Sequence, residues 1–263
     1  MSYFSYHDHQ HIAKRHAGSI EHDSELQLIY DKFYELHTAL YSRLRDLNYD
    51  LHAGAGTATP ISSFSVVNPN QTENLSLIYG RSREQALLVE RLMGRERNAA
   101  NSNVDICRHP VIELRLTPEH FVVELIVSPD AWWDQQNLVA KLGIARHRDT
   151  FRTLLQRLDG DFCIGFWSGE GLSDMHVTTR QLARGNYANE WMSTFGDGQD
   201  WLRVGMWYPP EAPELSARNI LRELLTRVGG LYSIYNFLLW TSNNDFHAFY
   251  NRFGMRTPNM HLS

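Results

Sequence analysis

Residues 110–127 restrict the fold of this chain more than any other segment. Two β-rich runs, PVIELRL and FVVELIV, flank the turn TPEH. Side chains alternate along the first run, with Ile112 and Leu114 on one side and Glu113 and Arg115 on the other. This pattern predicts an antiparallel hairpin that buries one face and keeps a semi-polar second face.

Four further runs, rich in β-branched, apolar and aromatic residues, predict more strands. They cover residues 61–67, 74–80, 162–167 and 201–208. Helical patterns lie between them at irregular spacing, which does not fit a repeated β-α-β winding. We therefore expect an α+β fold in which a mixed or antiparallel sheet of about six strands is covered by helices.

A long N-terminal helix is expected over residues 24–51. Its apolar residues recur at intervals of three or four and are Leu26, Ile29, Phe33, Leu36, Leu40, Leu44, Leu47 and Leu51. Such a stripe packs on a sheet or pairs with a second copy of the chain. Packing is the preferred interpretation, and a homo-oligomer formed through this helix is the alternative.

The C-terminal segment is predicted to be helical. Helical patterns cover residues 215–228, 231–240 and 245–253. A break is expected at Gly229 and Gly230, since glycine is a poor helix former. We expect residues 24–263 to form a single α+β domain. A helical subdomain over residues 210–263 is the alternative, because the segment PPEAP lies at its start.

Residues 1–23 are expected to form a flexible, His-rich tail, because no apolar period is sustained there. In an extended chain His7, His9 and His11 would point to one side. Imidazole nitrogens bind divalent ions such as zinc or nickel. The three histidines are therefore candidate metal ligands, with a solvated tail as the alternative.

A glycine-rich loop after the strand predicted over residues 162–167 carries Glu170, Asp174 and His176. Carboxylates and an imidazole can act as base and acid, or hold a divalent metal. Metal-assisted hydrolysis is therefore the catalytic hypothesis, and a polar surface turn is the alternative. The sequence has no GxSxG, Walker A, GxGxxG or HExxH motif. The sequence alone leaves open whether the protein is an enzyme.

Three charged residues of the predicted hairpin invite comparison with metal nucleases, which place acidic residues and a lysine on a sheet. Glu113, Arg115 and Glu124 fit this pattern poorly, because arginine stands where lysine is expected. Cross-strand ion pairing on a half-exposed face explains them more simply.

Arginine dominates the basic residues. Only three of the 25 Lys and Arg residues are lysine, and the net charge is −5, which excludes a generally basic protein. The candidate ligand-binding arginines lie on two predicted helices and are Arg83, Arg91, Arg95, Arg148 and Arg152. Guanidinium groups bind phosphate through two hydrogen bonds, so nucleic acid or a phosphate-bearing ligand is an expected partner. Ion pairing with the interleaved acidic residues is the alternative.

Aromatic residues at two predicted strand ends indicate a ligand cleft. Trp167 and Trp207 are candidates to line it, because each is next to another aromatic residue that must face the opposite way. The two cysteines are far apart, and the first ten residues do not resemble a signal peptide. We therefore expect a cytoplasmic binding protein, with a hydrolase and a self-associating structural protein as alternatives.

Overall fold

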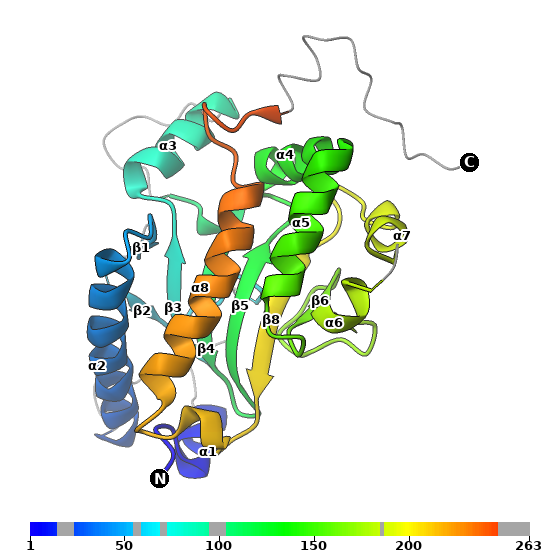
Figure 1. Cartoon of the computed structure of the whole chain (residues 1–263). Coiled ribbons are helices and arrows are strands. Elements are labelled where there is room, and N and C mark those ends of the chain that lie inside the picture. The colour runs from blue at the N-terminus through cyan, green and yellow to red at the C-terminus, as the bar shows by residue number, and fades with distance from the viewer. Residues whose placement is uncertain (15–23, 55–58, 69–72, 95–103, 185–186, 247–263) are drawn as a thin grey trace.

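The computed structural model describes residues 1–14, 24–54, 59–68, 73–94, 104–184 and 187–246 (Figure 1). Its strands are β1 (His52–Ala53), β2 (Ile61–Ser62), β3 (Leu75–Gly80), β4 (Val111–Leu116), β5 (Phe121–Val127), β6 (Cys163–Gly165), β7 (Val177–Thr178) and β8 (Leu202–Tyr208). They form one antiparallel sheet in the order β1-β3-β4-β5-β8-β6-β7, with β2 also paired to β3.

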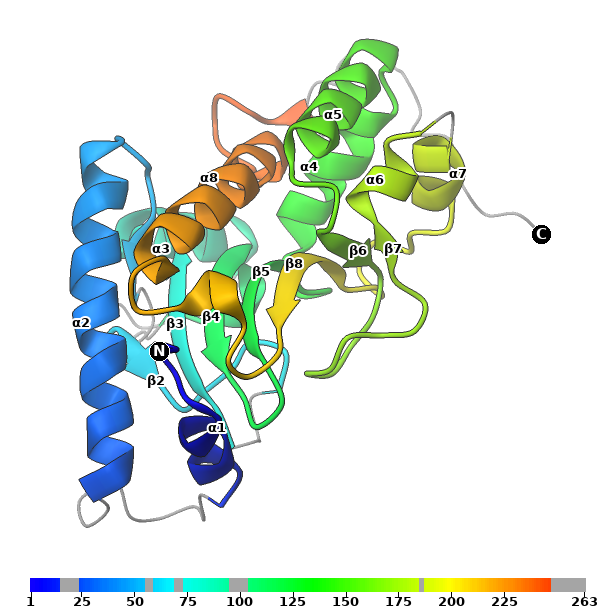
Figure 2. The same cartoon turned by 60° about the horizontal axis from the view of Figure 1, so that its bottom comes forward.

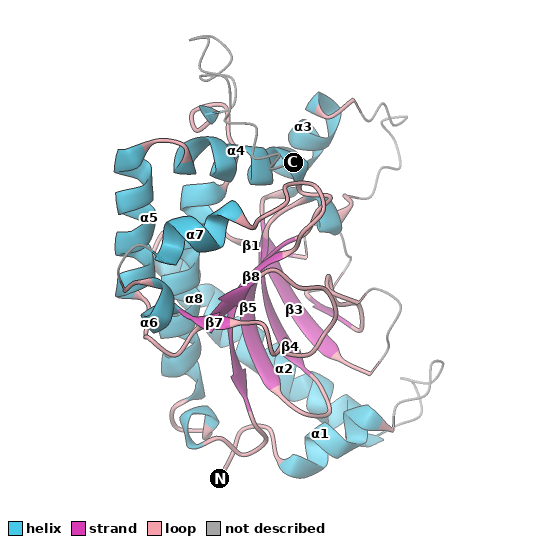
Figure 3. Ribbon diagram, turned by 90° about the vertical axis from the view of Figure 1, so that its right-hand side faces the viewer, coloured by secondary structure: helices cyan, strands magenta, loops and turns pink. Residues whose placement is uncertain are grey.

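The helices lie mainly on one face of this sheet (Figures 2 and 3). The α-helices are α1 (Tyr6–Ala13), α2 (Ser24–Asp46), α3 (Arg83–Leu92), α4 (Trp132–Leu142), α5 (Ala145–Arg157), α6 (Thr179–Leu182), α7 (Tyr187–Ser193) and α8 (Ile220–Leu238). Two short 3-10 helices cover Ile106–Arg108 and Pro213–Leu215. Among the described residues, no helix combines the length and the apolar character that crossing a bilayer requires.

The predicted α+β class and the covered sheet are confirmed. Strands β1 and β7 were not predicted. Each has only two residues, too few to show an alternation of apolar and polar side chains. The hairpin of β4 and β5 has the predicted position, with Leu116 opposite Phe121. Its second face is not semi-exposed, however. Every residue of both strands is buried, since loops cover the face opposite the helices (Figure 3).

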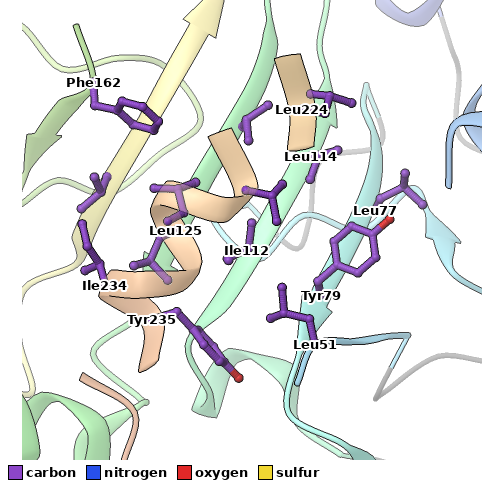
Figure 4. Close-up of a cluster of buried hydrophobic side chains, with 14 of the residues drawn as sticks. Leu51, Leu77, Tyr79, Ile112, Leu114, Leu125, Phe162, Leu224, Ile234 and Tyr235 are labelled. Atoms are coloured by element: carbon purple, nitrogen blue, oxygen red, sulfur yellow. The ribbon is translucent and has the colours of Figure 1, made fainter. Parts of the chain in front are cut away.

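The main core lies between the sheet and helices α2 and α8. Figure 4 shows Ile112, Leu114 and Leu125 of the sheet directed toward Leu224 and Tyr235 of α8. Six residues of the predicted α2 stripe are buried: Leu26, Ile29, Phe33, Leu36, Leu40 and Leu44. The apolar stripe of α2 therefore packs against the core of the same chain.

Helix α2 ends at Asp46, before the expected boundary at residue 51. Asn48 adopts a left-handed backbone with φ of 57°, a conformation that asparagine tolerates better than most residues. The amide of Tyr49 then donates to the carbonyl oxygen of Leu44 at 3.0 Å, which closes the last turn.

The N-terminal residues are packed, which corrects the prediction of a flexible extended tail. Phe4 is buried against the rings of Phe33 and Phe121. Ser5 caps α1, and its hydroxyl accepts a hydrogen bond from the amide of Asp8 at 3.2 Å. The prediction is wrong because the apolar partners of this segment lie far away in the sequence. Residues 15–23 of the predicted tail lie outside the described residues.

Helix α8 continues through Gly229 and Gly230, where the sequence predicts a break. Both glycines face close neighbours. A β-carbon on Gly229 would lie 3.0 Å from the hydroxyl oxygen of Tyr49, and one on Gly230 would lie 2.6 Å from a methyl carbon of Leu158. Tight packing of the helix against its neighbours thus explains the pair. The helix predicted over residues 245–253 lies almost wholly outside the described residues.

Candidate ligand-binding cleft

Four fully buried charges occupy the second face of the sheet. Arg115 pairs with Glu124 at 2.6 Å and with Glu113 at 3.3 Å. Arg203 donates from Nε to Glu124 at 2.8 Å and from Nη2 to the same carboxylate at 2.6 Å. The predicted cross-strand ion pairing is therefore correct, although the face is buried rather than half-exposed.

A glycine on the neighbouring strand makes room for this network. Gly205 lies directly opposite Glu124 in the pairing of β5 with β8. A β-carbon on Gly205 would lie 2.5 Å from the β-carbon of Glu124 and 2.8 Å from the carbonyl oxygen of Val123. The absence of a side chain at this position therefore lets the Glu124 carboxylate lie over the sheet.

Two loops above the sheet and the neighbouring strand β3 bind to these charges. Ser65 accepts a hydrogen bond from Arg115 at 3.0 Å, and Ser76 donates to Glu113 at 2.6 Å. Arg203 donates to the backbone oxygen of Gly169. The buried guanidinium of Arg203 thus holds the loop that follows β6.

A cleft of about 670 Å³ opens beside this loop. Its first wall is the segment after β6, and its second wall is the turn before β8. The lining residues are Phe166, Trp167, Ser168, Gly171, Leu172, Ser173, Gln199, Asp200 and Trp201. A predicted cleft near the ends of these strands is thus present, with Trp167 as one of its lining residues.

Both walls of the cleft are fixed by buried groups. On the first wall, the indole nitrogen of Trp167 donates to the Gly171 oxygen at 2.9 Å. On the second wall, the fully buried side chain of Gln135 accepts from the amide of Gly198 at 2.6 Å and donates to the Asp200 backbone oxygen at 2.9 Å. Asp200 itself accepts from the amide of Gly196 at 2.8 Å. These bonds hold the walls in place before any ligand arrives.

Trp167 folds back over the sheet because Gly165 has no side chain. A β-carbon on Gly165 would lie 2.8 Å from the Trp167 ring. The guanidinium carbon of Arg203 lies 4.9 Å from the centre of this ring and 5.6 Å from that of Trp207. Trp207 does not line the cleft but packs on Trp167, with 5.8 Å between the ring centres.

The residues predicted for hydrolysis do not form a joint site. Glu170 is half-buried and accepts a hydrogen bond from Asn74 at 3.2 Å, and burial raises the pKa of its carboxyl group. Asp174 is exposed, and the His176 ring bonds to the oxygen of Ser173 at 2.6 Å. Within the described ranges, no group of three or more His, Cys, Asp or Glu residues is placed to hold a metal ion.

The three tail histidines do not converge either. They lie on α1, where residues two positions apart point to opposite sides. His9 is buried and bonds to the Thr117 oxygen at 2.7 Å. His7 and His11 point toward Glu25, at 3.8 Å and 2.9 Å respectively. The expected trio of metal ligands depended on an extended chain, and the chain here is a helix.

The predicted ligand-binding arginines lie away from the cleft. Arg83 and Arg91 are exposed on α3. Arg148 donates to the Leu142 oxygen at 2.8 Å, and Arg152 pairs with Asp149 at 3.2 Å. Arg95 lies outside the described residues. Of the described residues that line the cleft, none is an arginine.

The sequence contains no local signal for Gln135, Gln199 or Asp200 as residues of the cleft. Gln135 holds the second wall through backbone groups 63 and 65 positions away, and no local pattern reveals that. The alternation of β8 could have pointed to Trp201, because it shares a face with Arg203 and Trp207.

The thiol of Cys107 is not an activated nucleophile. Cys107 precedes Arg108 and His109 in the sequence, so its thiol is expected to have a lower pKa than that of Cys163. Burial and neighbouring acidic groups instead raise the pKa of Cys107 to about 11.

No protein-family model matches this chain, and no curated protein shows significant similarity to its sequence.

Proposed function

We propose that this protein is a cytoplasmic binding protein that holds a small ligand in the cleft between residues 166–173 and 199–201. The observation that carries the proposal is the fixation of both walls by buried side chains. Arg203 and Gln135 are fully buried, and each bonds to wall backbone. Burying such polar groups is costly unless they are satisfied, and here their partners are the walls of a cleft.

The composition of the lining supports the same proposal. Ligand sites combine apolar and aromatic surface with a few well-placed polar groups. Three aromatic residues, Phe166, Trp167 and Trp201, line the cleft beside the polar residues Gln199 and Asp200. A pre-organised site of this kind binds with a smaller loss of conformational entropy.

A block of the cleft tests the proposal. Gly171 lines the cleft and has an ordinary backbone conformation, and a β-carbon added to it would have no neighbour within 4 Å. Gly171→Trp should therefore fill the cleft without straining the fold. Calorimetric titration with adenosine, glucose and choline should detect binding of at least one probe, and the variant should weaken it by about tenfold or more.

Gln156→Trp is the matched control, because Gln156 is exposed on α5 and does not line the cleft. It should bind like the unaltered protein. The proposal is wrong if none of the three probes binds, or if Gly171→Trp binds as tightly as the control.

A second candidate function, the binding of nucleic acid or a phosphate-bearing ligand, is favoured by Arg83 and Arg91. Both are exposed on one helix, α3. Affinity for a labelled oligonucleotide should then fall steeply with salt, because bound phosphates release counterions. A flat or absent response would remove this candidate. Self-association stays a third prediction, for which the test is the mass of the protein in solution at several concentrations.

A further inference from the structure

Three successive backbone oxygens of the first cleft wall, those of residues 169–171, accept hydrogen bonds from side chains. The donors, in the same order, are Arg203, Arg115 at 3.4 Å and the indole nitrogen of Trp167 at 2.9 Å. Both arginines are fully buried, and the ring of Trp167 packs on the guanidinium of Arg203. The loop therefore directs three oxygens in a row toward one cluster of side chains.

The amides of the same peptide groups point the other way. In a trans peptide the N–H lies opposite the C=O, and the described residues contain no cis peptide bond. The N–H groups of Glu170, Gly171 and Leu172 are therefore directed away from that cluster. Within the described parts of the chain, none of these three amides donates to another residue. Backbone N–H groups are strong donors, so a row of them is available to a ligand.

Gly171 shows that these donors belong to the cleft. It is one of the lining residues and has no side chain, so it lines the cleft with its backbone alone. Its oxygen already accepts from Trp167, which leaves the N–H as the free polar group of this backbone. A β-carbon on Gly171 would find no atom within 4 Å, so the space beside it is open. Leu172, which carries the next amide, lines the cleft as well.

The charge of the walls decides between an anion and a neutral ligand. Residues 166–174 and 196–201 together contain four acidic residues and no lysine, arginine or histidine. The two buried arginines beneath them are matched by the carboxylates of Glu113 and Glu124 at ion-pair distance. An anion would thus approach through a field of its own sign, whereas a neutral ligand with acceptor oxygens would not be repelled.

We propose that the cleft binds a neutral, hydroxyl-rich ligand, of which a monosaccharide is the representative. This proposal rests on the proposed function and names its ligand class. The N–H groups of Gly171 and Leu172 donate to oxygens of the ligand. A sugar hydroxyl accepts such a bond and can donate at the same time, which suits the polar residues of the lining. Those residues are Ser168, Ser173, Gln199 and Asp200.

The first test is a titration of the isotope-labelled full chain, followed by nuclear magnetic resonance. Glucose should shift the amide resonances of Gly171 and Leu172, because both N–H groups gain an acceptor. Cyclohexylmethanol, which has a ring of the same size but a single hydroxyl group, should bind at least about tenfold more weakly. Glucuronate, which adds one negative charge to the glucose skeleton, should also bind more weakly than glucose.

The second test removes one of the donors. Proline has no N–H, so Gly171→Pro should weaken the binding of glucose by about tenfold. Gly171→Ala keeps the N–H and is the matched control, which should bind glucose like the unaltered protein. If the proline variant does not fold, the unaltered protein still decides. Amide resonances of Gly171 and Leu172 that do not move at saturating glucose would overturn the proposal.

The remaining outcomes separate the two proposals. If adenosine or choline binds, is blocked by Gly171→Trp, and glucose does not bind, the ligand class is wrong and the binding cleft stands. Tighter binding of glucuronate than of glucose, or equal binding of cyclohexylmethanol, would reject the ligand class in the same way. If Gly171→Pro binds glucose as tightly as Gly171→Ala, the amides are not the donors and the inference fails. If no probe binds at all, both proposals fail together.

Discussion

At the scale of single residues, the carboxylate of Glu124 holds two buried arginines in place. It accepts hydrogen bonds from both Arg115 and Arg203, and all three side chains are 0 % exposed. A buried ion pair gives little net stability compared with apolar packing, but loss of one partner leaves an uncompensated charge in a medium that solvates it poorly. The guanidinium of Arg203 would then also lose its position under the Gly169 loop.

Glu124→Gln tests this dependence. The substitution keeps the shape but removes the carboxylate that both guanidinium groups share, so Arg115 and Arg203 lose their common counter-charge. We expect the free energy of unfolding, measured with urea, to fall by about 3 kcal/mol or more. Arg180→Ala is the control, since the ion pair of Arg180 with Asp161 is exposed and should change stability by less than about 1 kcal/mol. If both variants lost a similar free energy of unfolding, burial of the Glu124 ion pairs would not matter for stability.

At the scale of elements, strand β8 is constrained by what lies on its two sides. Leu202 and Val204 enter the main core, while Arg203 and Gly205 face the covered side of the sheet. Glycine normally weakens a strand, because it has no side chain to pack and its backbone is too free. Glycine is nevertheless needed at position 205, because a side chain there would collide with Glu124.

Gly205→Ala should therefore destabilise the protein, although alanine is usually the better strand residue. The new methyl group would meet the backbone oxygen of Val123 at 2.8 Å and the β-carbon of Glu124 at 2.5 Å, and neither can move away freely. We expect a loss of about 1–3 kcal/mol in thermal or urea unfolding. Gly171→Ala, with nothing within 4 Å, should be close to neutral. An unchanged melting temperature for Gly205→Ala would show that β5 and β8 can separate without cost.

At the scale of the whole molecule, a second buried cluster joins distant parts of the chain. Arg81, which follows β3, donates to both oxygens of Asp134 on α4, at 2.9 and 2.6 Å. It also donates to the Trp240 oxygen beyond α8 at 2.7 Å. The His109 ring lies beside the guanidinium, with 3.2 Å between the nitrogens. Burial, together with Arg81 and Arg108, lowers the pKa of His109 to about 3.

This shift makes global stability depend on pH in one direction. The pKa of His109 is lower in the folded than in the unfolded chain, so the unfolded state binds the extra proton between about pH 6.5 and 3. The contribution of neutral His109 is complete above about pH 6.5 and is lost as the pH falls toward 3. Between about pH 7 and pH 5 this amounts to about 2 kcal/mol.

The measurement is urea unfolding at about pH 7 and about pH 5 for the unaltered protein and for His109→Gln. Carboxyl groups contribute to the pH dependence of both proteins, so the informative quantity is the difference between them. The variant should lose less stability on acidification. If the two proteins lose the same amount, the histidine is not held neutral in the folded state.

Local pattern was enough to predict the regular parts of this fold. The alternation of residues 111–127 indicates the central hairpin, and the spacing from Leu26 to Leu44 indicates the buried stripe of α2. The start of α3 is likewise local, because Ser82 and Gln85 form a capping box there. These features repeat over a few residues, and the period of a strand or helix is a property of the backbone alone.

Tertiary structure decided which side chains meet. Arg81 is 2 % exposed because its guanidinium bonds to Asp134, a residue 53 positions further along the sequence. The sequence gives no sign of that contact, or that Gln135 holds the turn before β8, or that Glu170 is separated from Asp174 and His176. The sequence by itself therefore determined the α+β class and the main elements, because these depend on short periods. The cleft and its acidic, aromatic lining depend on contacts between distant segments, and only the packing of the sheet, helices and loops brings those together.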